Sequence, residues 1–247
     1  MQHALLHRAI ALVYPPECAM CRAPTGMEFA LCPDCLVETP FITGPVCQVC
    51  GIPVLGTTES ESSIVCDDCL SHPRPWGTAR AVLRYDKTAR KIVLALKHGD
   101  RLDLVRTVTP WMKKLAAPML KKNSLIVPVP MHPLRQFQRR YNQSAELARA
   151  LSLAIAWPYA AQALHRVRVT PSLDHRSREE RFDLLRNAIT ADPDMVGDRH
   201  ILLVDDVMTS GATLAASAEA ALKSGATGVD CLVLARVEKD DLGLQAC

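Results

Sequence analysis

The sequence has few aromatic side chains, with 4 Phe, 4 Tyr and 3 Trp among 247 residues. Proteins that hold single-stranded nucleic acid usually stack its bases on aromatic rings set among basic side chains. No interleaved pattern of basic and aromatic residues occurs along this chain. The composition therefore disfavours a single-strand binder of that kind.

The chain also lacks a strong net charge and a long apolar run. Its formal charge is +3, so it is not a polycation as a whole. The apolar stretch from Ala9 to Tyr14 is too short to cross a bilayer, and it follows His7 and Arg8 without a small-residue cleavage site. We therefore predict neither membrane insertion nor export, and we expect a cytoplasmic protein in which this stretch is a short helix packed on the following domain.

Positive charge is nevertheless concentrated in one window that contains arginine and no lysine. Such a window suits either bound anions or an ordinary solvated surface. Its members are Arg135, Arg139, Arg140, Arg149, Arg166, Arg168, Arg176, Arg178, Arg181 and Arg186.

Cysteine is plentiful and regularly spaced, because eight of the 10 cysteines form four Cys-x-x-Cys pairs. Two such pairs complete a tetrahedral zinc site of four cysteines, and a site made only of thiolates leaves no position for catalysis. Without an export signal, disulfides or an iron–sulfur cluster are weaker alternatives. We predict one or two structural zinc ions, either in chain order or with interleaved pairs; in chain order the sites are Cys18, Cys21, Cys32 and Cys35, then Cys47, Cys50, Cys66 and Cys69.

Two domains are expected, because Pro73, Pro75 and Gly77 interrupt the chain after the last cysteine pair. Residues 1–75 would form the cysteine-rich head with its short N-terminal helix. Residues 76–247 would form an α/β domain, and the hydrophobic content of 49% is enough for a packed core. Outside the pairs, Cys231 is expected as a small buried hydrophobe in a strand, while Cys247 has no evident partner.

The most informative stretch runs from Ile201 to Leu214. Four large apolar residues, 201–204, predict a strand buried on both faces of a parallel sheet and ending at Asp205 and Asp206. A turn rich in hydroxyl groups and a helical pattern follow, so unpaired amides at the helix start would point into the turn. The predicted phosphate-binding residues of this turn are Thr209, Ser210, Gly211, Ala212 and Thr213.

Two adjacent carboxylates can accept hydrogen bonds from neighbouring ribose hydroxyls or bind Mg²⁺ through water. A phosphate site beside a ribose site indicates a phosphoribosyl ligand. The alternative is a response-regulator receiver domain, in which an acid pair also follows a strand. That alternative needs four more strand–helix units, and too few residues follow Asp206 to supply them.

Other elements are expected around this stretch. Residues 81–85 read as a strand, and Asp86 is placed to cap a helix that Gly99 ends, with Lys97 near its end able to reach a phosphate or simply to face solvent. The helical pattern of residues 102–115 contains Pro110, which should kink or divide it. Residues 125–130 read as a buried strand.

Two further segments are rich in arginine, and the second of them is predicted to cover the site. Residues 131–142 read as an arginine-rich loop, in which Arg135, Arg139 and Arg140 could bind a pyrophosphate or remain solvated, and Asn142 is placed to cap the next helix. Residues 164–190 contain few apolar side chains and a Thr170-Pro171 turn, so we interpret them as a mobile flap or a plain surface connection.

The acid pair and the hydroxyl-rich turn resemble the signature of type I phosphoribosyltransferases. With the four cysteine pairs, the Lys97 helix, Val127-Pro128-Val129-Pro130 and Asn142-Gln143, nearly the whole chain resembles the ComF family. The resemblance implies a mainly parallel sheet flanked by helices, with phosphoribosyl pyrophosphate and Mg²⁺ as ligands. The family often has glycine where this chain has Arg140, and a threonine is more usual at Ser210.

The resemblance leaves three functions open. As an enzyme, the chain would hold the 5′-phosphate at residues 209–213 and the ribose at Asp205 and Asp206, transferring phosphoribosyl to an unknown acceptor by positioning and electrostatics. As an accessory protein of natural competence, it would bind single-stranded DNA or competence proteins. As a regulator, it would bind phosphoribosyl pyrophosphate without turnover.

Overall fold

The computed structural model describes residues 15–54, 64–98, 100–169 and 177–238. The predicted helix within residues 1–14, the expected helix stop at Gly99, the Thr170-Pro171 turn and Cys247 lie outside the described residues.

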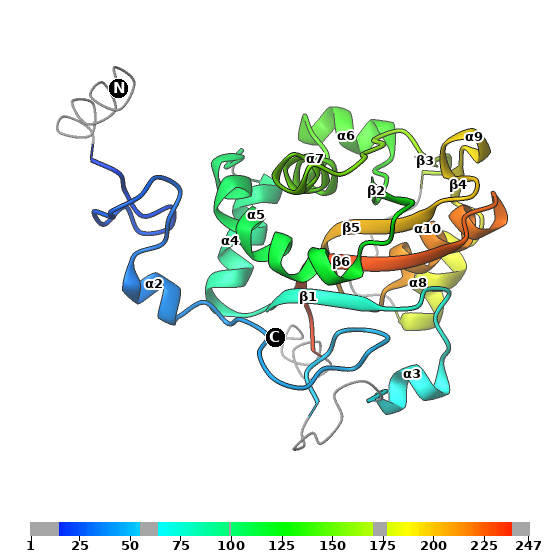
Figure 1. Cartoon of the computed structure of the whole chain (residues 1–247), viewed down its shortest axis with the longest axis horizontal. Helices are drawn as coiled ribbons and strands as arrows, with labels where there is room; N and C mark the ends of the chain where they lie inside the picture. The colour runs from blue at the N-terminus through cyan, green and yellow to red at the C-terminus, as the bar shows by residue number, and fades with distance from the viewer. Residues whose placement is uncertain (1–14, 55–63, 99, 170–176, 239–247) are drawn as a thin grey trace.

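A four-stranded parallel sheet forms the centre of the molecule (Figure 1). Its strand order is β1-β6-β5-β2, so the last strand in sequence lies between the first and the fifth. Residues 201–204 and 231–235 are almost inaccessible to solvent, as expected for central strands covered on both faces. The strands are β1 (Ala79–Arg84), β2 (Ser124–Pro128), β5 (His200–Met208) and β6 (Gly228–Arg236).

Helices cover both faces of this sheet. On one face, α4 (Lys87–His98), α5 (Asp103–Ala116) and α7 (Gln143–Ile155) share a core with Leu202 and Val204. On the other, α10 (Ala212–Lys223) packs on Ile201 and Leu203, and the antiparallel pair β3 (Leu164–Arg166) and β4 (Ile189–Ala191) adjoins it. The shorter elements are the 3-10 turn η1 (Ala117–Met119), α6 (Pro133–Arg139), α8 (Arg178–Leu185) and α9 (Pro193–Val196). The predicted α/β class, a mainly parallel sheet flanked by helices, is confirmed.

Two local predictions were wrong, and a third was wrong in part. Strand β5 does not end at the acid pair but continues to Met208, because Ala235 and Arg236 of β6 still offer backbone partners. Helix α5 runs through Pro110 and is not divided there, while the alternative, a kink at Pro110, stays a prediction. Residues 131–142 are not wholly a loop, since His132 caps α6 by accepting from the Leu134 amide, with Pro133 in the first turn, where its missing N–H costs nothing.

Arg140 ends α6 in the left-handed conformation, with φ of 68°. A side chain there costs roughly 1–2 kcal/mol, which glycine avoids. We therefore expect Arg140→Gly to stabilise the protein by about 1 kcal/mol, because its only described ion pair, with Asp100, is exposed. Urea denaturation measures this gain. Arg139→Gly is the matched control and should destabilise, since Arg139 lies inside the helix.

The cysteine-rich head consists of two small ribbons, each containing one short helix, α2 (Pro33–Val37) or α3 (Asp67–Ser71). The first ribbon lies beside α4 and α5, where Arg101 donates to the Ala19 carbonyl and the Arg106 guanidinium lies 4.8 Å from the Phe29 ring centroid. The segment that connects the two ribbons then lies along the edge of β1 opposite β6, where the Ile42 amide donates to the Val82 carbonyl. The head is thus hydrogen bonded to the sheet, while the domain boundary near Trp76 stays a prediction.

No helix in the described ranges is long and apolar enough to cross a membrane.

Candidate functional site

The eight paired cysteines form two separate clusters in chain order. The first contains Cys18, Cys21, Cys32 and Cys35, and the second contains Cys47, Cys50, Cys66 and Cys69. All sulfur atoms of a cluster lie within 4.8 Å of one another. The structure therefore selects the sequential pairing over the interleaved one.

Both clusters fit zinc. Four thiolates at about 2.3 Å from one ion would stand roughly 3.8 Å apart. The Cys21 and Cys32 sulfurs are 3.5 Å apart, and those of Cys50 and Cys66 are 3.7 Å apart. Backbone amides support the thiolates, as when Cys32 N–H donates to the Cys18 sulfur and Cys66 N–H to the Cys47 sulfur. The nine described cysteines are free, and Cys231 is buried in β6 as predicted.

The predicted acid pair lies near the carboxyl end of β5, where two helices meet it. The Ser144 hydroxyl at the start of α7 donates to Asp205 Oδ1 at 2.6 Å. Lys97 Nζ, near the end of α4, lies 3.3 Å from Asp206 Oδ2. Asn142 caps α7 as predicted, because its Oδ1 accepts from the Ser144 amide. The structure thus brings Lys97, Asp205 and Asp206 together, and it adds Ser144, which the sequence analysis did not identify.

The Asp205 carboxyl is harder to ionise than a free one. Burial raises its pKa to about 7, and the neighbouring Asp206 charge acts in the same direction. The Ser144 hydroxyl and the Asp206 amide oppose this rise in pKa by donating to the carboxylate. A carboxyl held in this way loses its proton near neutral pH, or at a lower pH when a cation or hydroxyl donors approach.

The predicted phosphate-binding turn joins the end of β5 to the start of α10. Gly211 has φ of 80°, and an added Cβ would lie 3.1 Å from Trp76 Cη2, so this position favours glycine for both reasons. The Ala212 amide donates to Ser210 Oγ, and no described contact pairs the amides of Thr213 and Leu214. Two helix-start amides are therefore available to an anion. We call residues 209–213 the 209–213 loop.

Three arginines far apart in sequence hold this loop. Arg236 Nη1 donates to the carbonyls of Met208 and Thr209, Arg74 Nη1 donates to the Ser210 carbonyl, and Arg181 Nη1 donates to Thr209 Oγ1. Of the three, only Arg181 belongs to the arginine-rich window, and no sequence pattern singles out Arg74 or Arg236. No short motif links these residues, because their roles depend on contacts between distant segments.

The other predicted arginines do not join the acid pair. Arg140 pairs with Asp100 Oδ2 at 3.4 Å on the surface, and no described contact links it or Arg139 to the acids or to the 209–213 loop. The side chain of Arg135 lies outside what the structure describes. The segment nevertheless adjoins Lys97, because Tyr141 Oη donates to the Leu96 carbonyl at 2.6 Å.

The predicted flap, residues 164–190, contains more regular secondary structure than expected. Residues 178–185 form α8 and residues 189–191 form β4, because Ser177 and Glu180 make a capping box and Leu185 packs with Ala212 under α10. Through Arg181, α8 contacts the 209–213 loop. The mobility predicted for this segment stays a prediction.

Known proteins resemble this chain along most of its length. The family described as Double zinc ribbon domain matches residues 9–70. The DNA utilization protein YhgH of Escherichia coli is 28% identical over 231 residues, covering 91% of this chain and 99% of its own. Competence protein F of Haemophilus influenzae is 25% identical, covering 89% and 96% respectively.

Among solved structures, the adenine phosphoribosyltransferase (APRTase) of Giardia lamblia complexed with 9-deazaadenine is 18% identical, with a TM-score of 0.38, and the match covers 62% of this chain and 78% of that one. The full-length relatives and the double zinc ribbon agree with the two four-cysteine clusters and with the residues on which the ComF resemblance was based. These findings support the assignment of the chain to the ComF family.

Proposed function

We propose that the protein binds phosphoribosyl pyrophosphate with Mg²⁺ at the acid pair and the 209–213 loop. The observation that carries this proposal is the placement of Asp205 and Asp206 just before the 209–213 loop, where the helix-start amides of Thr213 and Leu214 have no described partner. A ribose 5-phosphate has its hydroxyls and its phosphate separated by one sugar ring. The acid pair offers acceptors for the hydroxyls, and the helix-start amides that follow offer donors for the phosphate, so the site presents these groups in the same order.

Each part of the site has a task in this proposal. The 209–213 loop binds the 5′-phosphate, and Arg181, already hydrogen bonded to Thr209, adds a positive charge beside it. Asp205 and Asp206 accept hydrogen bonds from the ribose hydroxyls, and Lys97 lies next to them to neutralise the pyrophosphate. Mg²⁺ would supply further charge neutralisation for pyrophosphate, held through water by the acids.

Transfer of the phosphoribosyl group to an acceptor would need no nucleophilic side chain. The carboxylates stand where positive charge develops at C1 of the sugar, and the cations stand where negative charge leaves with pyrophosphate. Pyrophosphate release on adding candidate bases or amines separates an enzyme from a regulator. Eight thiolates reserved for metal also suit a reducing compartment, so we place the protein in the cytoplasm.

Calorimetry with phosphoribosyl pyrophosphate and Mg²⁺ tests the proposal directly. The variant Asp205→Asn/Asp206→Asn should bind at least about 100-fold more weakly, because each hydrogen bond to a charged group contributes roughly 1.5–3 kcal/mol. Asp183→Asn is the control, since Asp183 pairs with Arg186 on the surface and should bind like the wild type. Absence of binding by the wild-type protein would refute the ligand assignment.

A second candidate is an accessory role in the uptake or use of DNA. The observation that favours it is the naming of full-length relatives as a DNA utilization protein and a competence protein. A basic surface would bind the phosphate backbone with an affinity that falls steeply with salt. Single-stranded DNA binding that survives in the Asp205→Asn/Asp206→Asn variant would support this role, and binding lost with the acids would assign DNA to the same site.

A further inference from the structure

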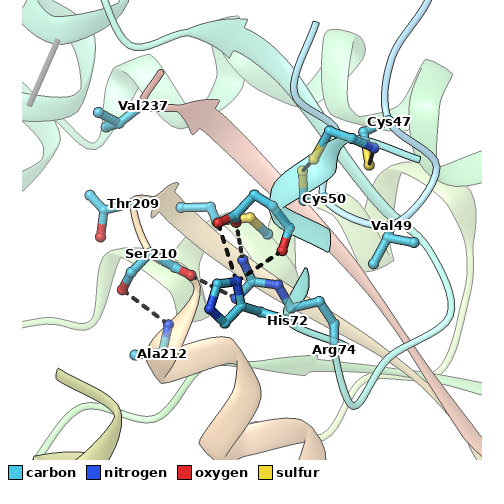
Figure 2. A network of polar contacts seen from close by, with 12 residues as sticks. Cys47, Val49, Cys50, His72, Arg74, Thr209, Ser210, Ala212 and Val237 are labelled. Atoms are coloured by element: carbon cyan, nitrogen blue, oxygen red, sulfur yellow. Dashed lines mark hydrogen bonds and ion pairs between the residues drawn. The ribbon is translucent and has the colours of Figure 1, made fainter. Parts of the chain in front are cut away.

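One arginine joins the second cysteine cluster to the 209–213 loop. Arg74 lies just after α3, and its side chain is only 2% exposed. Its Nη2 donates to Asp68 Oδ2 at 2.8 Å, and its Nη1 donates to the Ser210 carbonyl at 2.9 Å. Figure 2 shows this side chain between the second cluster and the start of the loop. A single planar guanidinium therefore fixes the loop backbone relative to α3.

The neighbouring tryptophan makes a second connection between the same two parts. Trp76 Nε1 donates to the carbonyl of Val49, which lies between the ligands Cys47 and Cys50. The ring of Trp76 lies against Gly211, and the Arg74 guanidinium lies 5.7 Å from its centroid. Movement of the second ribbon would therefore move the surface on which the 209–213 loop rests.

Charge reinforces these contacts. Four thiolates around one Zn²⁺ carry a net charge of about −2. The positive charge of Arg74 acts on the Cys69 thiolate, and that of Arg236 acts on Cys50. The same two arginines hold the carbonyls of residues 208–210. The loaded metal site would thus attract the two cations that shape the loop.

The first ribbon makes no such connection within the described residues. It contacts Arg106 of α5, and it accepts a hydrogen bond from Arg101, which lies just before α5. The two four-cysteine sites are alike in chemistry but differ in what they touch. The chain therefore contains its own control for any effect of metal loss.

We infer that Arg74 is a positioning residue through which metal at the second cluster fixes the 209–213 loop in its anion-binding form. Phosphate affinity then depends on occupancy of Cys47, Cys50, Cys66 and Cys69, and not on occupancy of the first cluster. This inference deepens the proposed function and depends on it for the identity of the ligand. The coupling between metal and loop does not depend on that identity.

Amide hydrogen exchange in peptides covering residues 207–215, measured without ligand, tests the coupling. We expect Arg74→Gln, with both zinc ions retained, to exchange about tenfold faster there than the wild type. Cys66→Ser, with one zinc, should do the same. Cys35→Ser also loses one zinc but should exchange like the wild type in this region. Arg84→Gln controls for loss of an arginine, because Arg84 is exposed and pairs with Glu238.

Calorimetry with phosphoribosyl pyrophosphate and Mg²⁺ then shows whether loop and affinity change together. Arg74→Gln and Cys66→Ser should bind about tenfold more weakly, and Cys35→Ser should not. Unchanged exchange in a two-zinc Arg74→Gln protein overturns the inference, as does equal loosening in Cys35→Ser. If Cys66→Ser does not fold, Arg74→Gln decides alone. If the wild type binds no ligand, the proposed function fails while the exchange result still decides the coupling.

Discussion

Asp205→Asn should stabilise the free protein by about 2–4 kcal/mol at pH 8, although it removes a binding group. A carboxyl whose pKa rises from 3.8 to about 7 on folding is costly to ionise in the folded state, at about 1.36 kcal/mol for each pH unit. Asparagine keeps a side-chain oxygen for Ser144 and the Asp206 amide but carries no charge. The stabilisation therefore comes from removing a half-buried charge beside the buried Asp206.

The raised pKa of Asp205 also determines how the free energy of unfolding changes with pH. Between pH 4 and pH 7 the folded protein keeps the Asp205 proton while the unfolded chain releases it, so the free energy of unfolding falls as pH rises through this window. Asp205→Asn should remove this fall, with little stabilisation near pH 4 and the full gain at pH 8. Urea denaturation at both pH values, without Mg²⁺, measures it.

Asp183→Asn serves as the control, because the Asp183 side chain is 67% exposed and its substitution should change stability by less than about 0.5 kcal/mol. A wild-type protein as stable at pH 8 as Asp205→Asn would show that the carboxyl ionises without cost.

Removal of zinc should unfold the cysteine-rich head and leave the sheet folded. Structural zinc binding contributes on the order of 10 kcal/mol per site to the folding of small zinc modules, and the fully buried residues of the core around the second cluster are all ligands. The sheet has two large apolar cores that contain no cluster cysteine. We expect a strong chelator to abolish amide protection in residues 15–54 and 64–75 while most far-UV circular dichroism remains.

Metal analysis of the untreated protein should return two zinc ions per chain. Cys231→Ala is the matched control, because this thiol is buried in β6 away from both clusters and its loss should leave the zinc content unchanged. A metal-free protein with a fully protected head would contradict the assignment of structural zinc.

Local sequence patterns predicted the parts of the site that are themselves local. Cys-x-x-Cys spacing identified all eight members of the two clusters, because two thiolates in one tight turn need no distant partner to be recognised. The apolar run 201–204 likewise identified the central strand, and the following acids and glycine identified its turn. The pairing of the cysteines needed the structure, since spacing permitted two arrangements.

What the sequence could not show depends on contacts between distant segments. Arg74 and Ser210 are separated by 136 positions, and nothing near Arg74 distinguishes it from a linker arginine. The end of β5 was misplaced because its last pairs belong to β6, which lies beyond an intervening helix. Helix α6 was missed because histidine is a less common helix cap than the side chains usually sought.

The strand order has a consequence for how the protein is made. Strand β1 has one partner within the sheet, β6, and Ala79 pairs with Cys231 near the far end of the described chain. A ribosome delivers residues in order, so β1 leaves the exit tunnel long before its partner exists. The zinc ribbons can load their metal during that interval, whereas closure of the sheet must wait for the final strand to insert between two strands already made.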